Sequence, residues 1–337
     1  MKHKLHLLLI AAIAIFYFAA DGFADSARSD GSFMGYGQSF KRDSTNVSNA
    51  IYHWRTTFNP DSTELSFLRR HNVKRLYIRM FDVEYGEDYT SKFRNVTPTA
   101  TTKFESAIPE GIEIVPTVYI TLEALREMDD FSYRYAELIV ERILAMARYN
   151  NCGEIREIQF DCDWTATTRH IFVSLCREAK EHLQEKGIEL SCTVRLHQLR
   201  EMAPPVDRAV LMLYNTGGLK SPKTRNSILD VKDVVPYLRN QETYEIPLDL
   251  ALPTFGWGVK FRDGKFDKIV ADGASDSLKE NEYIRWERPT IEEILFVRQL
   301  AERVLGQSER GNILYHLDYS QLSNYTDDEI TKLYSFN

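Results

Sequence analysis

Eight short apolar runs, rich in β-branched or aromatic residues, recur along the chain and alternate with helical patterns. Such runs are typical of buried β-strands. They fall at residues 51–58, 75–83, 113–120, 157–164, 189–197, 208–215, 246–253 and 312–319. Helical patterns occupy residues 63–71, 133–149, 168–186, 228–239 and 290–305. Eight strands alternating with helices predict an α/β protein, a (β/α)8 or TIM barrel.

Two segments depart from the regular alternation. Residues 200–207 leave room for only a short connection between the fifth and sixth strands. Residues 257–273 hold two β-like runs around Asp263 and Gly264, a dipeptide favoured in two-residue hairpin turns. We therefore predict a small β-hairpin insertion at residues 256–289, after the seventh strand. It would either wall a groove at the barrel mouth or be a tolerated surface insertion.

The size and charge of the chain fit one exported barrel domain. Its 337 residues are 43% hydrophobic, which is enough for a single large core, and we assign residues 50–337 to that domain. The net charge of −7 gives no reason to expect binding to nucleic acid or to anionic membranes. No motif for a cofactor, a phosphate loop or a metal site is present, so we expect none of these.

The first 24 residues have the pattern of a signal peptide. Lys2 and Lys4 precede an apolar stretch at residues 7–20, which is too short for a membrane span, and small residues follow it. We expect cleavage before Asp25, a loosely ordered lead-in at residues 25–49, and export to the periplasm or the extracellular space.

Four cysteines leave two interpretations open. Cys152, Cys162, Cys176 and Cys192 could form disulfides in an exported protein, or they could be small core residues. We favour the core interpretation, because three of them fall in predicted buried elements.

Polar residues gather at the carboxyl ends of the predicted strands, where the loops of a barrel converge on one mouth. Because strand side chains alternate, Gln159, Asp161 and Asp163 share one face of their strand, and we expect the two carboxylates to point into the barrel. Buried carboxylates need partners, which Arg79 or Arg195 could supply as purely structural ion pairs. Paired carboxylates also serve general acid and base chemistry, as in glycosidic cleavage. The other polar residues at strand ends are Asp82, Glu84, Tyr214, Asn215, His316 and Asp318.

Three segments resemble the family 18 chitinase-like glycoside hydrolases. They are FDCDWT (160–165), LMLYN (211–215) and LALPTFGWG (250–258), which are similar to motifs on strands four, six and seven of that family. The resemblance implies a TIM barrel that acts on a glycan. It also implies that Asp163 orients and Tyr214 binds a substrate acetamido group, with Asn215 beside them. Trp257 replaces the arginine of the family's strand-seven motif and could offer a sugar-stacking face or serve only as a packing residue.

The departures from the family pattern concern the catalytic acid. The strand-four motif ends in Glu in the family, whereas this chain has Thr165, whose hydroxyl cannot act as a raised-pKa carboxylic acid. Ile158 also stands where the longer family motif has its first Asp.

Three hypotheses follow. The first is an exported barrel that recognises an oligosaccharide or polysaccharide and lacks the family's catalytic Glu. The second is an active glycoside hydrolase that uses another carboxylate pair, and the third is a structural or assembly protein whose buried charges are only structural. The candidate catalytic residues are Asp161, Asp163, Asp318 and Glu84, and the candidate substrate-binding residues are Asp82, Tyr214, Asn215, Trp257 and Trp164.

Overall fold

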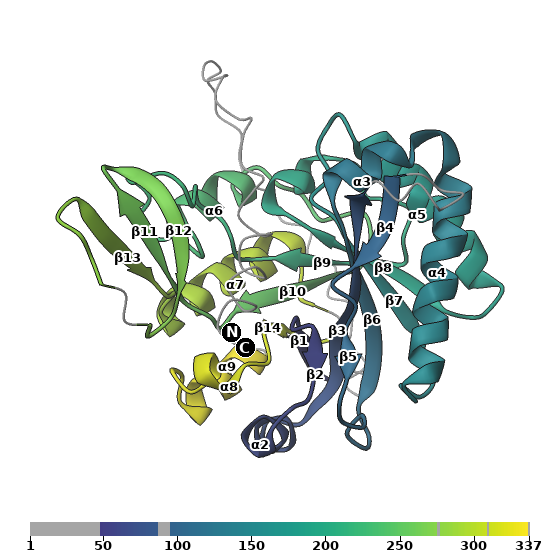
Figure 1. Ribbon diagram of the computed structural model, residues 1–337, viewed down its shortest axis with the longest axis horizontal. Coiled ribbons are helices and arrows are strands. Elements are labelled where there is room, and N and C mark those ends of the chain that lie inside the picture. Colours follow the sequence, from purple (N-terminus) through teal and green to yellow (C-terminus); the bar gives the residue numbers. More distant parts are fainter. Residues whose placement is uncertain (1–47, 87–94, 275–276, 309, 336–337) are drawn as a thin grey trace.

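Eight parallel strands form a closed barrel in the computed structural model, which describes residues 48–86, 95–274, 277–308 and 310–335 (Figure 1). The barrel closes because β1 pairs with both β3 and β14. This arrangement confirms the predicted (β/α)8 fold. In chain order the barrel strands are β1 (Asn49–His53), β3 (Val73–Gly86), β6 (Glu113–Ile120), β7 (Glu157–Asp161), β8 (Glu189–Val194), β9 (Arg208–Met212), β10 (Leu248–Pro253) and β14 (Ile313–Tyr315).

Helices cover the outside of the barrel. α2 begins after Asp61, whose side chain accepts from the backbone N–H groups of Thr63 and Glu64 in a capping box. Only the short 3₁₀ helix η3 (Leu196–Arg200) lies between β8 and β9, as the short connection there required. The α-helices are α2 (Ser62–Arg70), α3 (Leu122–Glu127), α4 (Ser132–Tyr149), α5 (Arg169–Gln184), α6 (Val231–Leu238), α7 (Ile291–Leu305), α8 (Tyr319–Leu322) and α9 (Asp327–Tyr334).

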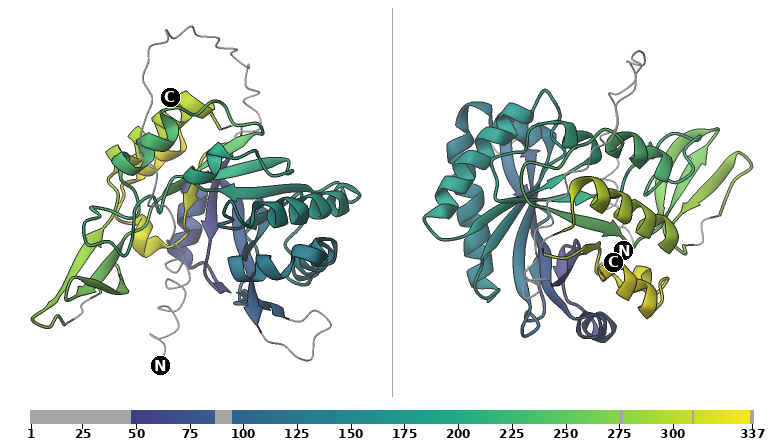
Figure 2. Two further views of the ribbon diagram at one scale, coloured as in Figure 1. Left: turned by 90° about the horizontal axis from the view of Figure 1, so that it is seen from above. Right: turned by 180° about the vertical axis from the view of Figure 1, so that it is seen from behind.

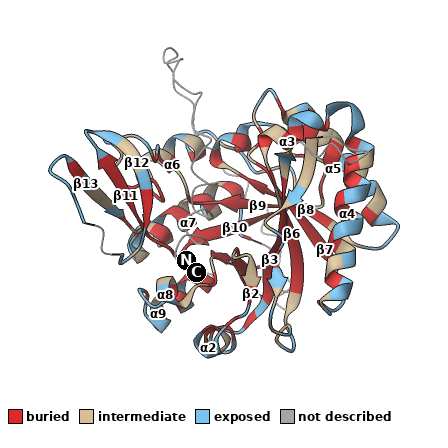
Figure 3. Ribbon diagram, in the orientation of Figure 1, coloured by how far each residue is buried: buried red, intermediate tan, exposed pale blue. Residues whose placement is uncertain are grey.

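Side-chain alternation on β7 separates an apolar layer from a polar barrel interior. Ile158 and Phe160 are fully buried in the hydrophobic core, whereas Gln159 accepts a hydrogen bond from the Tyr52 hydroxyl at 2.8 Å. At the opposite end of the barrel from the mouth, Arg310 donates to Glu157 at 2.7 Å. The barrel is therefore a packed core with internal hydrogen bonds, and its strands are mostly buried, as their red colour in Figure 3 shows.

A β-hairpin that sequence analysis did not predict extends from the second barrel strand. β3 continues beyond the barrel and pairs antiparallel with β4 (Asn95–Thr99), from Asp82↔Thr99 to Gly86↔Asn95. A short parallel pair, β2 (Thr57–Phe58) and β5 (Lys103–Phe104), lies nearby in the sequence. The second strand is thus longer than predicted, because its outer part is hydrogen-bonded to β4.

The segment after β10 forms a three-stranded antiparallel sheet that projects from one side of the barrel (Figure 2). Its strands are β11 (Trp257–Arg262), β12 (Lys265–Ala271) and β13 (Glu282–Glu287). Asp263 and Gly264 connect β11 to β12 with φ values of 50° and 71°, a left-handed pair that suits this dipeptide. The third strand, β13, is an element that the sequence did not indicate.

Three further features concern the cysteines, the N-terminal segment and possible membrane spans. All four cysteines are buried and free, so the structure contains no disulfide between them. The predicted signal peptide and nearly all of the predicted lead-in lie outside the described residues. Among the described residues, no helix is long and apolar enough to cross a membrane.

Candidate functional site

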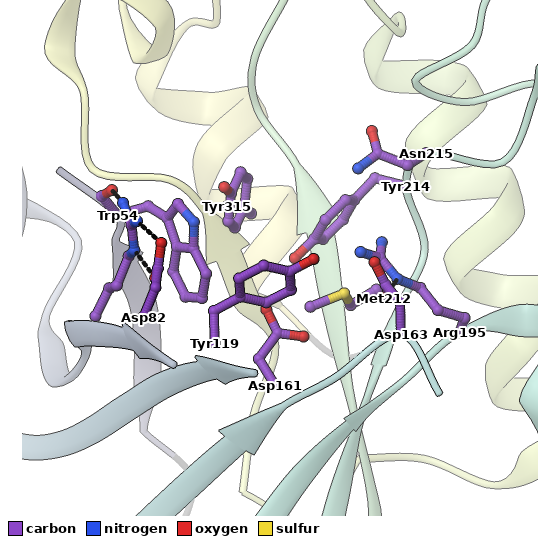
Figure 4. Close-up of a pocket in the computed structure, with 11 residues that line it drawn as sticks. Trp54, Asp82, Tyr119, Asp161, Asp163, Arg195, Met212, Tyr214, Asn215 and Tyr315 are labelled. Carbon is purple, nitrogen blue, oxygen red and sulfur yellow. Dashed lines mark hydrogen bonds and ion pairs between the residues drawn. The ribbon is translucent and has the colours of Figure 1, made fainter. Parts of the chain in front are cut away.

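A pocket lies at the barrel mouth, where side chains from seven of the eight barrel strands or the residues that follow them meet (Figure 4). The free volume between these side chains is about 30 Å³, which is room for a small chemical group rather than for a whole sugar ring. The pocket is lined by Trp54, Arg79, Asp82, Tyr119, Asp161, Asp163, Arg195, Met212, Tyr214, Asn215 and Tyr315.

Two neighbouring carboxylates on the fourth barrel strand have different environments. Asp161 is 3% exposed and accepts a hydrogen bond from the Thr193 hydroxyl at 2.6 Å. Burial, with the adjacent Asp163 as a second cause, raises the pKa of Asp161 to about 7. Asp163 is partly exposed and accepts from Arg195 Nε at 2.5 Å. The pocket therefore holds one carboxyl group that readily keeps its proton beside one that is ion-paired.

A second ion pair lies across the pocket. Arg79 binds Asp82 through two nitrogens, with Nε 2.6 Å from Oδ1. The Arg79 guanidinium also lies 5.9 Å from the centre of the Trp54 ring and donates to the Trp54 carbonyl at 3.4 Å. Burial raises the pKa of Asp82, and the Arg79 hydrogen bond opposes this effect. The sequence suggested Arg79 or Arg195 as a partner for Asp161 and Asp163, and only Arg195 pairs with one of them, Asp163.

Aromatic rings fill the rest of the pocket. Tyr214 stacks on Tyr315 with ring centres 4.8 Å apart, and Trp54 lies 5.9 Å from Tyr315. The Tyr214 hydroxyl and Arg195 Nη1 are buried and have no hydrogen-bond partner among the described residues. Because unsatisfied buried donors are costly, these two groups are suited to bind oxygen atoms of a ligand.

Five predicted site residues meet in this pocket. They are Asp82, Asp161, Asp163, Tyr214 and Asn215. The other four candidates do not line it.

Trp164 and Trp257, two of the candidates that do not line the pocket, are packing residues. Trp164 is 1% exposed, and its ring stacks on Phe172 with centres 6.3 Å apart. Trp257 is also buried, and its indole N–H donates to Glu287 at 2.9 Å. Neither ring therefore offers a free face to a ligand.

Asp318 and Glu84, the other two candidates that do not line the pocket, lie in other environments. Asp318 is the N-cap of α8, and its side chain accepts from the backbone N–H of Ser320 at 3.0 Å. Glu84 lies on the outer part of β3, opposite Thr97 of β4. β14 ends at Tyr315, so the side chain at the eighth strand end that faces the pocket is Tyr315, not Asp318.

Thr165 does not line the pocket either. It lies in the turn before α5, where its carbonyl accepts from the backbone N–H groups of Thr168 and Arg169. Its hydroxyl lies 3.0 Å from the Thr167 hydroxyl and 3.3 Å from that of Thr168. The side chain at this position is thus engaged in local turn contacts.

Sequence reasoning missed four aromatic or sulfur-containing side chains of the pocket, which are Trp54, Tyr119, Met212 and Tyr315. Each lies within a predicted strand, although only Tyr119 lies next to that strand's predicted carboxyl end. They were overlooked because only polar residues at strand ends were considered.

Across residues 48–86, 95–274, 277–308 and 310–335, no group of three or more His, Cys, Asp or Glu side chains is arranged to hold a metal ion.

Comparison with known proteins identifies the fold. No protein-family model matches the chain, and no curated protein matches it. Among solved structures, it is similar to the spore cortex-lytic enzyme SleL of Bacillus cereus, with 15% identity, a TM-score of 0.50, and 86% of this chain and 74% of that chain covered. SleL of Bacillus megaterium gives 13% identity, a TM-score of 0.51, and coverage of 86% and 75%. A chitinase from Chromobacterium violaceum gives 11% identity, a TM-score of 0.50, and coverage of 82% and 98%.

The chain is therefore an α/β barrel with a polar and aromatic pocket at its mouth. More specifically, it has the barrel fold of chitinases and spore cortex-lytic enzymes, which confirms the fold that the three sequence motifs implied.

Proposed function

We propose that this protein is an exported, glycoside-hydrolase-like barrel that binds a carbohydrate polymer without cleaving it. The observation that carries this proposal is the composition of the mouth pocket. Its lining combines four aromatic rings with three carboxylates and two arginines, and the Tyr214 hydroxyl has no partner among the described residues. Such a mixture of flat apolar faces and hydrogen-bonding groups suits the alternating C–H and hydroxyl surfaces of a sugar.

The size of the pocket indicates which part of a sugar would enter it. About 30 Å³ accommodates a substituent such as an acetamido or hydroxymethyl group, with the sugar ring resting over the rim. Arg195 Nη1 and the Tyr214 hydroxyl would donate to an oxygen atom of that group. The similarity to chitinases and cortex-lytic enzymes favours N-acetylated polymers such as chitin and peptidoglycan as the first ligands to test.

The absence of hydrolysis follows from Thr165. Glycosidic cleavage needs a proton donor at the leaving oxygen and a second group on the other side of the bond. The chitinase-like acid position holds a threonine that lies outside the pocket lining, so the proposed protein binds the glycan but does not protonate it.

A binding assay tests this proposal. The chain from residue 25 onward would be mixed with insoluble chitin and with peptidoglycan sacculi, and the bound fraction and the released reducing ends would both be measured. We expect saturable binding with no release above a blank, and at least tenfold weaker binding for Tyr214→Phe or Asp163→Asn. Absence of binding to both polymers and to a broader glycan array would overturn the proposal.

The environment of Asp161 favours an active hydrolase as the second candidate. A carboxyl group with a pKa near 7 next to an ion-paired carboxylate is the kind of pair that divides acid and base roles. Reducing-end release that disappears in both Asp161→Asn and Asp163→Asn, while neither variant melts below the wild type, would establish this alternative.

A structural role is the third candidate, and the two arginine–carboxylate pairs favour it. Asp82 and Asp163 are both ion-paired within the barrel mouth. If the wild type binds no glycan and Asp161→Asn and Asp163→Asn both melt early, the buried charges serve the fold alone.

Export and domain organisation are part of the proposal. We infer that residues 1–24 are removed, that residues 25–49 form a lead-in, and that residues 50–337 form one domain with its insertion at residues 256–289. Mass spectrometry of the protein from the medium or periplasm of an expressing cell should give a chain that begins at Asp25. A chain retained in the cytoplasm with Met1 intact would contradict export.

A further inference from the structure

One face of the sheet formed by β11, β12 and β13 is hydrogen-bonded to residues 219–227 at the side of the barrel. Arg285 donates to the carbonyls of Ser221 at 2.7 Å and Leu219 at 3.1 Å. Glu287 accepts from the Ser227 backbone N–H at 2.9 Å and from the Trp257 indole at 2.9 Å. Alternation places Arg285 and Glu287 on the same face of β13, so this inner face holds the sheet in position.

The opposite face of the sheet carries a half-exposed tryptophan. Trp286 is 49% exposed and lies directly across from Gly258 in the β11–β13 register. A Cβ atom at Gly258 would lie 2.9 Å from Trp286 Cζ3 and 2.6 Å from Ile284 Cγ2. The six-membered ring of the indole therefore rests against the glycine backbone, in space that any larger residue would fill.

Charged side chains lie further along the same face of the sheet. Lys260 Nζ lies 2.8 Å from Glu282 Oε2, and Arg262 Nε lies 2.9 Å from Glu282 Oε1. In the register, Lys260 and Arg262 of β11 lie opposite Ile284 and Glu282, on the same face as Trp286. This face of the sheet therefore carries ion-paired side chains in line with Trp286.

We propose that Trp286 is a sugar-stacking platform, a second glycan contact outside the mouth pocket. A pyranose ring presents a flat set of C–H groups that packs on an indole face, while its hydroxyl groups reach polar side chains at the ring edge. The inner-face contacts hold the sheet without Trp286, so packing does not explain a large exposed ring at this position. The inference rests on the proposed glycan-binding function and extends it to a longer polymer.

The platform is connected to the pocket through short, rigid elements. β11 begins only three residues after β10 ends. Phe255, in that connection, packs against Trp257 at 5.3 Å and against the pocket residue Tyr315 at 5.5 Å between ring centres. Aromatic contacts thus link the start of the sheet to a residue that lines the pocket.

Co-sedimentation with chitin and with peptidoglycan sacculi tests the platform. We expect Trp286→Ala to weaken binding to the polymer that the wild type binds by at least fivefold, and Trp286→Phe to recover part of the loss. Tyr149→Ala is the matched control, because Tyr149 is 87% exposed at the end of α4, and its affinity should equal the wild type. The melting temperature of Trp286→Ala should stay within about 2 °C of the wild type, since the ring is half in solvent.

The outcomes separate the platform from the function on which it rests. If the wild type binds a polymer and Tyr214→Phe weakens binding while Trp286→Ala does not, the platform inference is wrong and the glycan-binding function stands. If the wild type binds neither polymer, both are wrong. If Trp286→Ala instead abolishes a dimer seen by sedimentation velocity without changing polymer binding, the exposed face is a self-association surface, and the platform is wrong.

Discussion

Asp161 is a buried carboxylate whose pKa is raised by its surroundings. It is fully enclosed, faces the adjacent carboxylate of Asp163, and its pKa is raised to about 7. Because the folded-state pKa exceeds the unfolded value of about 3.9, the protonated carboxyl stabilises the fold below about pH 4. This contribution is lost as the pH rises through about 7.

The variant Asp161→Asn tests this environment through the pH dependence of stability. Asparagine keeps an oxygen acceptor for Thr193 but cannot ionise, so its free energy of unfolding should improve relative to the wild type between pH 4 and pH 8. The upper limit of this gain is about 4 kcal/mol, since each pKa unit is worth about 1.4 kcal/mol. The measurement is urea unfolding at several pH values, with the exposed turn variant Asp263→Asn as control. Parallel curves for wild type and Asp161→Asn would show that the Asp161 carboxyl is ionised across this range.

The candidate site could be predicted in part at the scale of residues. Alternation along one strand was enough to expect Asp161 and Asp163 inside the barrel. The sequence offered Arg79 or Arg195 as their partner, and Arg195 does pair with Asp163, whereas Arg79 pairs with Asp82 instead. It did not show where β14 ends, so Asp318 was expected at the mouth, whereas the strand stops at Tyr315 and Asp318 caps α8. A two-residue difference in strand length is enough to change which side chain reaches the pocket.

At the scale of elements, Glu287 joins the β11–β13 sheet to the barrel side. This carboxylate is 3% exposed, and its two oxygens accept from Ser227, Trp257 and Arg285. Every donor in this group is buried or half-buried, so removing the acceptor leaves several of them without a partner.

We therefore expect Glu287→Ala to lower the free energy of unfolding by about 3 to 5 kcal/mol. The measurement is chemical denaturation followed by tryptophan fluorescence, which also reports on Trp257. Glu242→Ala, at an exposed position in the loop before β10, should change the value by less than about 0.5 kcal/mol. Equal stability of the two variants would mean that the sheet is not held by Glu287.

Elements with a strong periodic pattern were predicted well, and those defined by pairing were not. The strand at residues 113–120 and the helix at 133–149 are continuous patterns that match β6 and α4 closely. β4 and β13 were missed because Asn95–Thr99 contains a proline and Glu282–Glu287 is highly charged, and both are stabilised as strands by antiparallel partners. A local sequence pattern carries no information about such pairing partners, because they lie elsewhere in the chain.

At the scale of the whole molecule, the four thiols are all enclosed by the barrel and its helices. Cys162, Cys176 and Cys192 are fully buried, and burial raises the pKa of each thiol well above its ordinary value. Protonated, inaccessible thiols do not react with disulfide reagents.

We expect no rapid thiol titration with an aromatic disulfide reagent in the folded protein, and four reactive thiols after denaturation. The protein should be purified without reductant from the compartment to which it is exported. Recovery of two or no thiols after denaturation would show that cysteines were cross-linked, and would contradict the structure.

The fold of the whole molecule was the most predictable property, since eight strands in alternation with helices have one common closed arrangement. Its proposed function rests on a single substitution within that fold, the threonine at position 165. The most direct test is a single incubation of the mature chain with the polymer that it binds, with bound protein and reducing ends measured in the same sample. We predict saturable binding with no increase in reducing ends over many hours. Sustained release of reducing ends, lost in Asp161→Asn and Asp163→Asn, would show that the barrel is an active hydrolase.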